Sequence, residues 1–477
     1  MDIEQAKQLR RELDVFVSLF SDCIKTEPSR RHFRTYVAGQ VSNLERKNVA
    51  AIALDVGVPP RSLQEFLGIH LWDELGARDR VQERVMGRHA DPNGTGVIDE
   101  TSFPKKGDKT AGVQRQYCGA TGKTDNCVVT VHLGYVTEDF HALLDADLYL
   151  PEAWLADRER CREAGIPDSV VYRPKWRIAL DLLDHALGKG VRLKWVTADE
   201  EYGRCTAFRT QVGAWGLFYV VEVPCSQTGW TRRPRVVEPR ERRSPRRGRP
   251  PRKPRLAWNA PPARRVDALW KRGGPSWGLF HIKNTEKGPV VWEARLSRFF
   301  PWDEELPGEE CWLIVARNVL DGKVKYFLSN APRDTPAEVL LHVAFNRCHV
   351  ERLFQDSKGE VGLDHFEVRH YRALRRHLVL SMVSLLFLEE QTQRIRGEKS
   401  VVEPLRGSRG RRSTTRPADR PEREDTPPPR GFPQDRILAA GKATGGPLPL
   451  ETAPKGTQTT RHQAVPSQKV LQCFLAL

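Results

Sequence analysis

The sequence predicts an α/β protein whose central sheet contains strands of both directions and has helices on its flanks. Two observations lead to this fold class. Residues 96–150 hold apolar segments of strand type, separated by short turns rich in Gly, Lys and Asp. Residues 176–224 then alternate helical and strand patterns, an order that is typical of such mixed sheets. The length of 477 residues is enough for two to four domains.

The first region, residues 1–85, is predicted to be a helical domain. Apolar side chains recur there at helical spacing: Leu13, Phe16, Leu19 and Phe20. Residues 51–68 contain two short helical patterns around a Gly-Val-Pro-Pro turn, which resembles a helix-turn-helix. The second helix would present Arg61, Ser62 and Gln64 to a groove of DNA. A helical hairpin used only for packing explains the same pattern, so both interpretations stay open.

The strands of the predicted sheet begin near residue 96, and residues 90–225 form the first part of the sheet domain. The segments GVIDETSFPK, QRQYCGA, CVVTVHLGYV and ALLDADLYL follow one another as strands. A helix over residues 176–187 leads to the strand in RLKWVTAD. A further helix over residues 205–212 leads to the strand LFYVVEVP.

Residues 226–330 are predicted to be a basic and β-rich insertion into this domain. Residues 231–265 contain fourteen Lys or Arg and two Glu, a net +12, which leaves about +4 of the total +16 for the other residues. Such a run attracts polyanions, and a solvated linker is the plainer alternative. The remainder ends in the strands WLIVARN and VKYFLSN. It is rich in tryptophan: Trp270, Trp277, Trp292, Trp302 and Trp312.

Residues 331–394 return to helical patterns and are predicted to complete the sheet domain. A helix over residues 335–358 opens with a capping box, in which Pro336 takes the first helical position and Glu338 the closing one. A second helix spans residues 371–394.

Composition predicts the character of the C-terminal segment and the cellular location of the protein. Residues 395–477 are rich in Pro, Arg, Thr and Gly, and we expect them to be disordered. The most apolar stretch, residues 378–388, is about half the length that crosses a bilayer. The N-terminus lacks the basic start and apolar core of a signal peptide. The sequence therefore predicts an intracellular protein without a membrane partner.

Two acids lie at the ends of apolar strands. Asp99 ends the segment VID, and Asp199 ends the segment WVTAD. An acid at the end of a buried strand is costly unless it is paired or binds a cation, and two on neighbouring strands would point to one place. Acids also commonly begin the loops that follow strands, so neither position is diagnostic by itself.

A third acid belongs to the helix predicted over residues 335–358. Arg347, Glu351 and Lys358 stand at positions i, i+4 and i+11, at angles of about 0°, 40° and 20° around the helix. They therefore share one face of it. A solvated row of ion pairs gives the same spacing. The rest of the helix is apolar, so the polar face can instead border a cleft.

These segments together resemble a known family. VIDETSFPKKG, TADEEYG and the helical pattern RxxxExxxxxxK are similar, in this order, to the three acidic motifs of the DDE transposases of bacterial insertion sequences. The stretches ERKNVAAIALDVGVPPRSLQEFL and ERLFQDSKGEVGLDHFEVRHYRALRRH resemble the insertion-sequence-701 branch, which is related to the insertion-sequence-4 type. The resemblance covers roughly residues 30–225 and 310–390. It implies a ribonuclease H-like fold for the catalytic domain.

The resemblance also implies the chemistry. Asp99, Asp199 and Glu351 would hold two Mg²⁺ ions, for which Mn²⁺ can substitute. The enzyme would cut DNA at the ends of its element and join them to target DNA. Arg347 and Lys358 would contact the cut end, beside the helix-turn-helix residues Arg61 and Gln64.

The partners and location follow from the same resemblance. These are double-stranded DNA, in the form of terminal inverted repeats and target DNA, and a second copy of the chain on the paired ends. The location is the cytoplasm, at the nucleoid. One aromatic side chain of the insertion can stack on a flipped base in related enzymes, and the candidates are Trp258, Trp270, Trp277 and Trp292.

Two alternative functions stay open at this point. One is a transposase-derived DNA-binding protein without catalysis, and the other is a ribonuclease H-like nuclease that cuts without strand transfer.

Spacing along the chain argues against a phosphate-binding loop and against a zinc site. In GATGKT, residues 119–124, the glycine that a phosphate-binding loop needs five residues before Gly122 is replaced by Tyr117. No CxxC pair occurs, and the histidines lack zinc-like spacing: His132, His141, His342, His349 and His365.

Overall fold

The computed structural model describes residues 3–239, 253–270, 273–285 and 288–406. The described residues up to Ile395 form one compact unit. All elements below belong to that unit, apart from residues 396–406 at the end of the last helix. Residues 240–252 of the basic run, and residues 407–477 of the tail predicted to be disordered, lie outside the described part.

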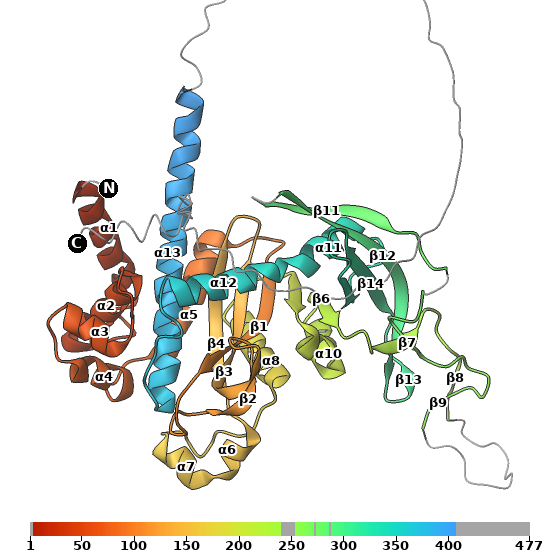
Figure 1. Cartoon of the computed structure of the whole chain (residues 1–477), viewed down its shortest axis with the longest axis horizontal. Coiled ribbons are helices and arrows are strands. Elements are labelled where there is room, and N and C mark those ends of the chain that lie inside the picture. The colour runs from red at the N-terminus through yellow and green to blue at the C-terminus, as the bar shows by residue number, and fades with distance from the viewer. Residues whose placement is uncertain (1–2, 240–252, 271–272, 286–287, 407–477) are drawn as a thin grey trace, which may run out of the picture. The chain divides into compact units, whose positions relative to one another are not determined.

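The centre of the unit is a mixed sheet (Figure 1). Its path is β10-β7-β12-β14-β15-β6-β5-β1-β3-β2, with β4 paired to β3 and both β11 and β13 paired to β12. Strand β1 is parallel to β5, and β5 is parallel to β6, while the other pairs along the sheet are antiparallel. The predicted mixed α/β class is therefore confirmed, and the sheet is of the ribonuclease H-like type.

The strands of the first part of the sheet agree with the predicted segments. They are β1 (Thr95–Pro104), β2 (Gln114–Cys118), β3 (Lys123–Val136), β4 (His141–Tyr149), β5 (Trp195–Ala198) and β6 (Phe218–Val223). Nearly every residue of β1 and all four of β5 are buried, as expected for strands in the middle of a sheet that is covered on both faces. Gly122, with φ of +67°, lies in the tight turn between β2 and β3, so GATGKT forms a hairpin.

Helices cover the two faces of the sheet. Gly96 of β1 faces Leu183 of α8 (Lys175–Gly188). Gly134, on the opposite face of β3, lies against Leu353 of α12 (Cys348–Gly359). Smaller helices connect the strands: α6 (Glu152–Ala156), α7 (Arg158–Glu163), α9 (Glu200–Gly203) and α10 (Thr206–Ala214). The two predicted helices before β5 and β6 are thus confirmed as α8 and α10.

Most of the β-rich insertion extends the same sheet, while its short strands β8 (Val236–Val237) and β9 (Arg255–Leu256) pair with each other in a separate sheet. Strands β14 (Cys311–Asn318) and β15 (Val324–Ser329) continue from β6, and β12 (Gly288–Asp303) follows β14. The remaining strands are β7 (Thr228–Trp230), β8 (Val236–Val237), β9 (Arg255–Leu256), β10 (Arg264–Arg265), β11 (Gly278–Thr285) and β13 (Leu306–Pro307). The described ends of the basic run therefore contain short strands.

The prediction of one continuous helix over residues 335–358 is wrong in two respects. The segment is divided into α11 (Ala337–Asn346) and α12, with Arg347 between them. The N-cap of α11 is Pro336, which makes no side-chain cap, so the predicted capping box does not form. No Pro or Gly lies at the division, and Arg347 itself keeps helical angles (φ −56°, ψ −29°). The long helix α13 (Tyr371–Arg406) begins where predicted and extends beyond residue 394.

The N-terminal region is helical, as predicted. It consists of α1 (Ile3–Ser18), α2 (Glu27–Val41), α3 (Val49–Asp55), α4 (Pro60–Gly68) and α5 (Glu74–His89). Gly57, with φ of +69°, makes the turn between α3 and α4. One face of α4 is fully buried through Leu63, Phe66 and Leu67, so the helical pair packs into the unit while its other face is exposed.

Among the residues that the structure describes, no helix has the length and apolar character that crossing a bilayer requires. The apolar residues 378–388 are instead buried within α13.

Candidate active site

The two acids that were predicted to end apolar strands lie beside each other. Asp199 follows β5 as predicted, but Asp99 lies in the middle of β1, at the point where the pairing of β1 with β5 ends. Strand β1 runs parallel to β5 with Ile98 opposite Ala198, so Asp99 and Asp199 follow at the same edge of the sheet. The Asp99 carboxylate accepts a 2.8 Å hydrogen bond from the backbone N–H of Glu100. Asp199 caps the short helix α9 and accepts a 3.0 Å hydrogen bond from the backbone N–H of Glu201. The expected convergence of these two acids is therefore confirmed.

The pleat of β1 sends its two consecutive acids to opposite faces. Asp99 shares the face of Val97, which is opposite Gly134 and so lies on the side of α12. Glu100 lies on the side of α8, where it forms a 2.7 Å ion pair with Lys175. Sequence reasoning did not separate these roles, although the alternation of a strand contains the signal.

Arg347 contacts Asp99 directly and lies near two further acids. Its Nη1 donates a 2.9 Å hydrogen bond to Asp99 Oδ2. The same guanidinium lies 3.7 Å from Glu351 Oε1 and 4.0 Å from Glu222 Oε2. Because Arg347 stands between α11 and α12, its side chain reaches β1 and β6 as well as the first turn of α12. The predicted neighbourhood of Arg347 and Glu351 is confirmed, but Arg347 precedes α12 instead of lying within one continuous helix.

Glu222 is an acid of this site that sequence reasoning missed. It lies on β6, the third of the parallel strands, and forms a 2.7 Å ion pair with Lys325. An acid inside the apolar strand LFYVVEVP was the available signal. Gly203 of the motif TADEEYG packs directly on this strand, since a Cβ there would overlap the carbonyl oxygen of Glu222. The glycine thus allows α9 to approach β6 closely.

Burial dominates the electrostatics of the acids. The Asp99 carboxylate is in a residue that is only 9% exposed, and this burial raises its pKa to about 7, against the opposing effect of Arg347. The negative charge of Asp199 raises the pKa of Asp99 further. Burial also raises the pKa of Asp199, again opposed by Arg347. Two neighbouring carboxyl groups with one shared arginine thus favour an added positive charge.

Carboxylate oxygens are the donors that Mg²⁺ prefers, and this ion usually keeps several of its waters. Asp99 is buried and Asp199 is half-buried beside it, whereas the Glu351 side chain is 68% exposed on α12. This combination of buried and solvent-facing carboxylates fits a hydrated divalent cation. Arg347 would have to release Asp99 in part when such an ion binds, because both compete for the same oxygen.

The remaining residues predicted to bind DNA are distributed over two places. Lys358 lies on α12 with its Nζ 5.6 Å from the centre of the Phe103 ring, and burial lowers its pKa. Arg61 and Gln64 are exposed on α4. They line a cavity of about 900 Å³ together with basic residues of the segment before and at the start of α13: Arg369, His370, Arg372 and Arg375.

The four tryptophans proposed for base stacking differ in exposure. Trp258 is 98% exposed, and Trp292 is only 6% exposed and packs on Phe345. Trp277 is covered by two guanidinium groups, those of Arg295 at 4.3 Å and Arg317 at 4.5 Å from the ring centre. Trp292 is therefore a core residue, Trp270 and Trp277 are partly exposed, and Trp258 is the most exposed of the four.

A ribonuclease H-like sheet with two acids at the point where the pairing of its central parallel strands ends defines a class of nucleic-acid-processing enzymes. A family model described as "DDE superfamily endonuclease" matches residues 19–274, which is more than half of the chain. The chain therefore belongs to the DDE superfamily endonucleases, and it is an enzyme of that family. The matched segment includes Asp99 and Asp199, while Glu351 lies beyond it.

The chain is also similar to a protein of Microchaete diplosiphon described as "Probable transposase for insertion sequence element IS701". The two are 28% identical over 364 residues, which cover 75% of this chain and 80% of the relative. These comparisons confirm the resemblance that the three acidic motifs predicted.

Proposed function

We propose that this protein is a DNA transposase that cuts the ends of its own element and transfers them into target DNA. The observation that carries the proposal is the meeting of Asp99, Glu351 and Glu222 at the Arg347 guanidinium, with Asp199 at the adjacent strand end. Acids from three neighbouring strands and one helix that gather around one arginine suit the metal-dependent transfer of phosphodiester bonds.

Asp99, Asp199 and Glu351 are the proposed ligands of two Mg²⁺ ions, which when bound would activate a water and stabilise the leaving oxygen. Glu222 lies close enough to Arg347 to orient it. Arg347 would exchange its bond with Asp99 for a bidentate contact to a DNA phosphate, since a guanidinium matches phosphate geometry. Lys358 would add a positive charge along the same helix.

The proposed partners are double-stranded DNA with the terminal inverted repeats of the element, target DNA, and a second copy of the chain that holds the paired ends. Arg61 and Gln64, exposed on α4 beside the basic segment of α13, are proposed to contact the repeat. An enzyme with this substrate would work at the nucleoid in the cytoplasm.

The test is incubation of the purified protein with its own flanking DNA and Mg²⁺ or Mn²⁺, with nicked and joined products resolved on gels. Wild-type protein should yield both products. Glu351→Gln should abolish cleavage while leaving DNA binding intact. The matched control is Glu338→Gln, an exposed acid on the neighbouring helix α11, which should cleave at the wild-type rate.

The outcomes separate this proposal from its alternatives. Nicked products without joined products would identify a nuclease without strand transfer. Binding without nicks in the wild type would identify a DNA-binding protein that has lost catalysis. Cleavage by Glu351→Gln at the wild-type rate would refute the assignment of this acid.

A further inference from the structure

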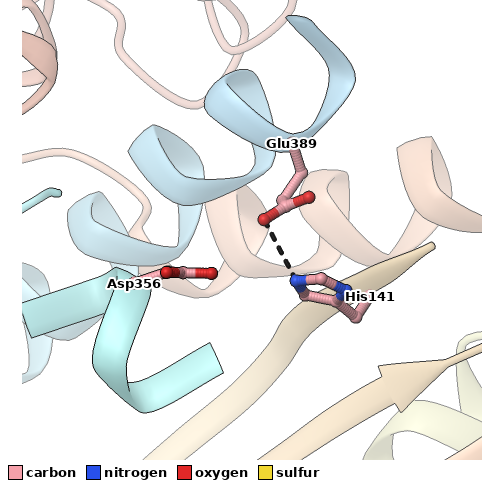
Figure 2. A group of neighbouring side chains, drawn as sticks. All are labelled: His141, Asp356 and Glu389. Atoms are coloured by element: carbon pink, nitrogen blue, oxygen red, sulfur yellow. Dashed lines mark ion pairs between the residues drawn. The ribbon is translucent and has the colours of Figure 1, made fainter. Parts of the chain in front are cut away.

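A second group of possible metal ligands consists of residues other than the acids around Arg347 (Figure 2). His141 is the first residue of β4, Asp356 lies on α12, and Glu389 lies on α13. One ligand atom of each residue lies within 4.8 Å of the others, and His141 Nε2 is 3.1 Å from Glu389 Oε1. Three elements that are distant in sequence therefore bring one imidazole and two carboxylates together.

Burial makes this arrangement costly without a cation. Asp356 is 7% exposed and Glu389 is 6% exposed. Arg352 donates a 2.8 Å hydrogen bond to Asp356 Oδ2, but the Arg352 side chain is itself 41% exposed. Burial raises the pKa of Asp356 in spite of this partner. Two buried carboxylates face one partly solvated arginine and one histidine, so negative charge is left to be balanced whenever the histidine is neutral.

The imidazole of His141 supplies the second argument. Its Nε2 atom is buried and has no hydrogen-bond partner among the described residues; it lies 3.1 Å from Glu389 Oε1, an ion pair only when the imidazole is protonated. A neutral imidazole can present a lone pair at this atom, and imidazole is the commonest protein ligand of transition metals. The nitrogen therefore faces the carboxylates in the manner of a metal ligand.

We propose that His141, Asp356 and Glu389 form a binding site for a divalent transition metal, with Zn²⁺ as the best match. A mixed set of one nitrogen and two oxygens suits Zn²⁺, whereas Mg²⁺ prefers oxygen donors alone. The site shares no residue with the acids around Arg347, so it does not depend on the proposed transposase function.

The position of the site indicates a structural role. Asp356 lies on the same helix as Glu351, one turn and a half further along. A metal held by β4, α12 and α13 would fix α12 against the sheet and thereby fix the exposed Glu351. The spacing of histidines in the sequence could not reveal this site, because each ligand comes from a different element.

The experiment uses the full chain with Asp99→Asn, Asp199→Asn and Glu351→Gln, so that the other carboxylate site cannot hold metal. After removal of metal with a chelator, Zn²⁺ binding is measured by competition with a chromophoric chelator. One Zn²⁺ per chain should bind. Adding Glu389→Gln should weaken binding by more than the roughly 10–100-fold that loss of an outer-shell partner costs.

The matched control is Glu390→Gln, at the next position of α13. Its side chain has the same 8% exposure as that of Glu389 but pairs with Arg84. This variant should bind Zn²⁺ as the parent does. Equal Zn²⁺ affinities of the Glu389→Gln and Glu390→Gln proteins, or no Zn²⁺ bound by the parent, would overturn the proposal.

A second measurement covers the case in which Glu389→Gln does not fold. The Co²⁺ form of the parent, with the three active-site substitutions only, should show paramagnetically shifted imidazole resonances, and these should disappear in His141→Gln. Co²⁺ bound to the folded parent without such resonances would contradict the assignment of His141 as a ligand.

Discussion

Two arginines of this protein, one buried and one half-buried, have different main partners. Arg376 of α13 is 2% exposed and donates to the carbonyl oxygens of four residues at and after the end of α4: Phe66, Leu67, His70 and Trp72. Arg347 instead faces the carboxylates of Asp99, Glu222 and Glu351. A backbone carbonyl group does not change its protonation state, whereas a carboxylate group can bind a proton, a metal ion or a new partner.

This difference in partners separates an arginine that stabilises the fold from an arginine that acts in the reaction. The contacts of Arg376 supply hydrogen-bond donors to carbonyl groups at and after a helix end, and they hold the N-terminal helices to α13. The guanidinium of Arg347 offsets the negative charge of the neighbouring carboxylates, and each of these contacts can be exchanged for another partner. We therefore expect substitution of Arg376 to act on stability and substitution of Arg347 to act on catalysis.

The largest expected effect is that of Arg376→Ala. It leaves several buried carbonyl groups without donors, at about 1–3 kcal/mol for each unsatisfied group, and removes the partner of Glu74. We expect the free energy of unfolding to fall by about 3–5 kcal/mol, as measured by urea denaturation. Arg372→Ala, an exposed arginine of the same helix, should change it by less than about 0.5 kcal/mol. Similar losses for both variants would remove the contrast between the two arginines.

Arg347→Lys should have the next largest effect, and on the reaction instead of the fold. Lysine keeps the charge beside Asp99 but loses the two parallel donors that hold a phosphate. We expect cleavage of element-end DNA to slow by about 100-fold, equivalent to about 2.7 kcal/mol. The unfolding free energy should change by less than about 1 kcal/mol. A stability loss as large as that of Arg376→Ala would make Arg347 a structural residue.

A smaller effect is expected at the contact between α2 and α13. Tyr36 and His377 share a 3.0 Å hydrogen bond in the buried interface. Tyr36→Phe keeps the ring and removes this bond, so unfolding should become easier by about 1 kcal/mol. Cleavage per folded molecule should not change. A cleavage defect at unchanged stability would show that this interface also influences the site around Arg347.

The smallest expected effect is that of Arg61→Ala, which should leave stability unchanged because its partner Glu65 is on the same exposed helix surface. If Arg61 contacts a DNA phosphate, the slope of log affinity against log salt concentration should fall by about 0.9. The affinity is measured by fluorescence anisotropy at several salt concentrations. An unchanged slope would favour a purely structural role for the helical pair of α3 and α4.

Local features of the sequence were sufficient for most of the sheet. Strands β1 to β6 lie where alternation and turn residues predicted them, because short apolar segments between Gly, Lys and Asp turns have few other ways to be buried. The order of motifs also predicted that Asp99 and Asp199 would meet, since the ends of adjacent parallel strands lie at one edge.

The same local features of the sequence did not predict the long-range contacts. The division of the predicted helix at Arg347 has no local breaker, and it coincides with the residue that bonds Asp99. Glu222 joined the site only because β6 lies beside β5 in space. The continuation of the sheet into β15 and β14 was also invisible in a segment that composition marks as an insertion.

The sequence by itself determined the fold class, the three acidic motifs and the family, because these depend on local pattern and on the order of short segments. The tertiary structure alone decided which acids share Arg347 and which side chains gather around His141. The physical reason is that charge balance in a buried place depends on groups from several elements. Their distances are set by the packing of the whole sheet and its helices, and no spacing along the chain records them.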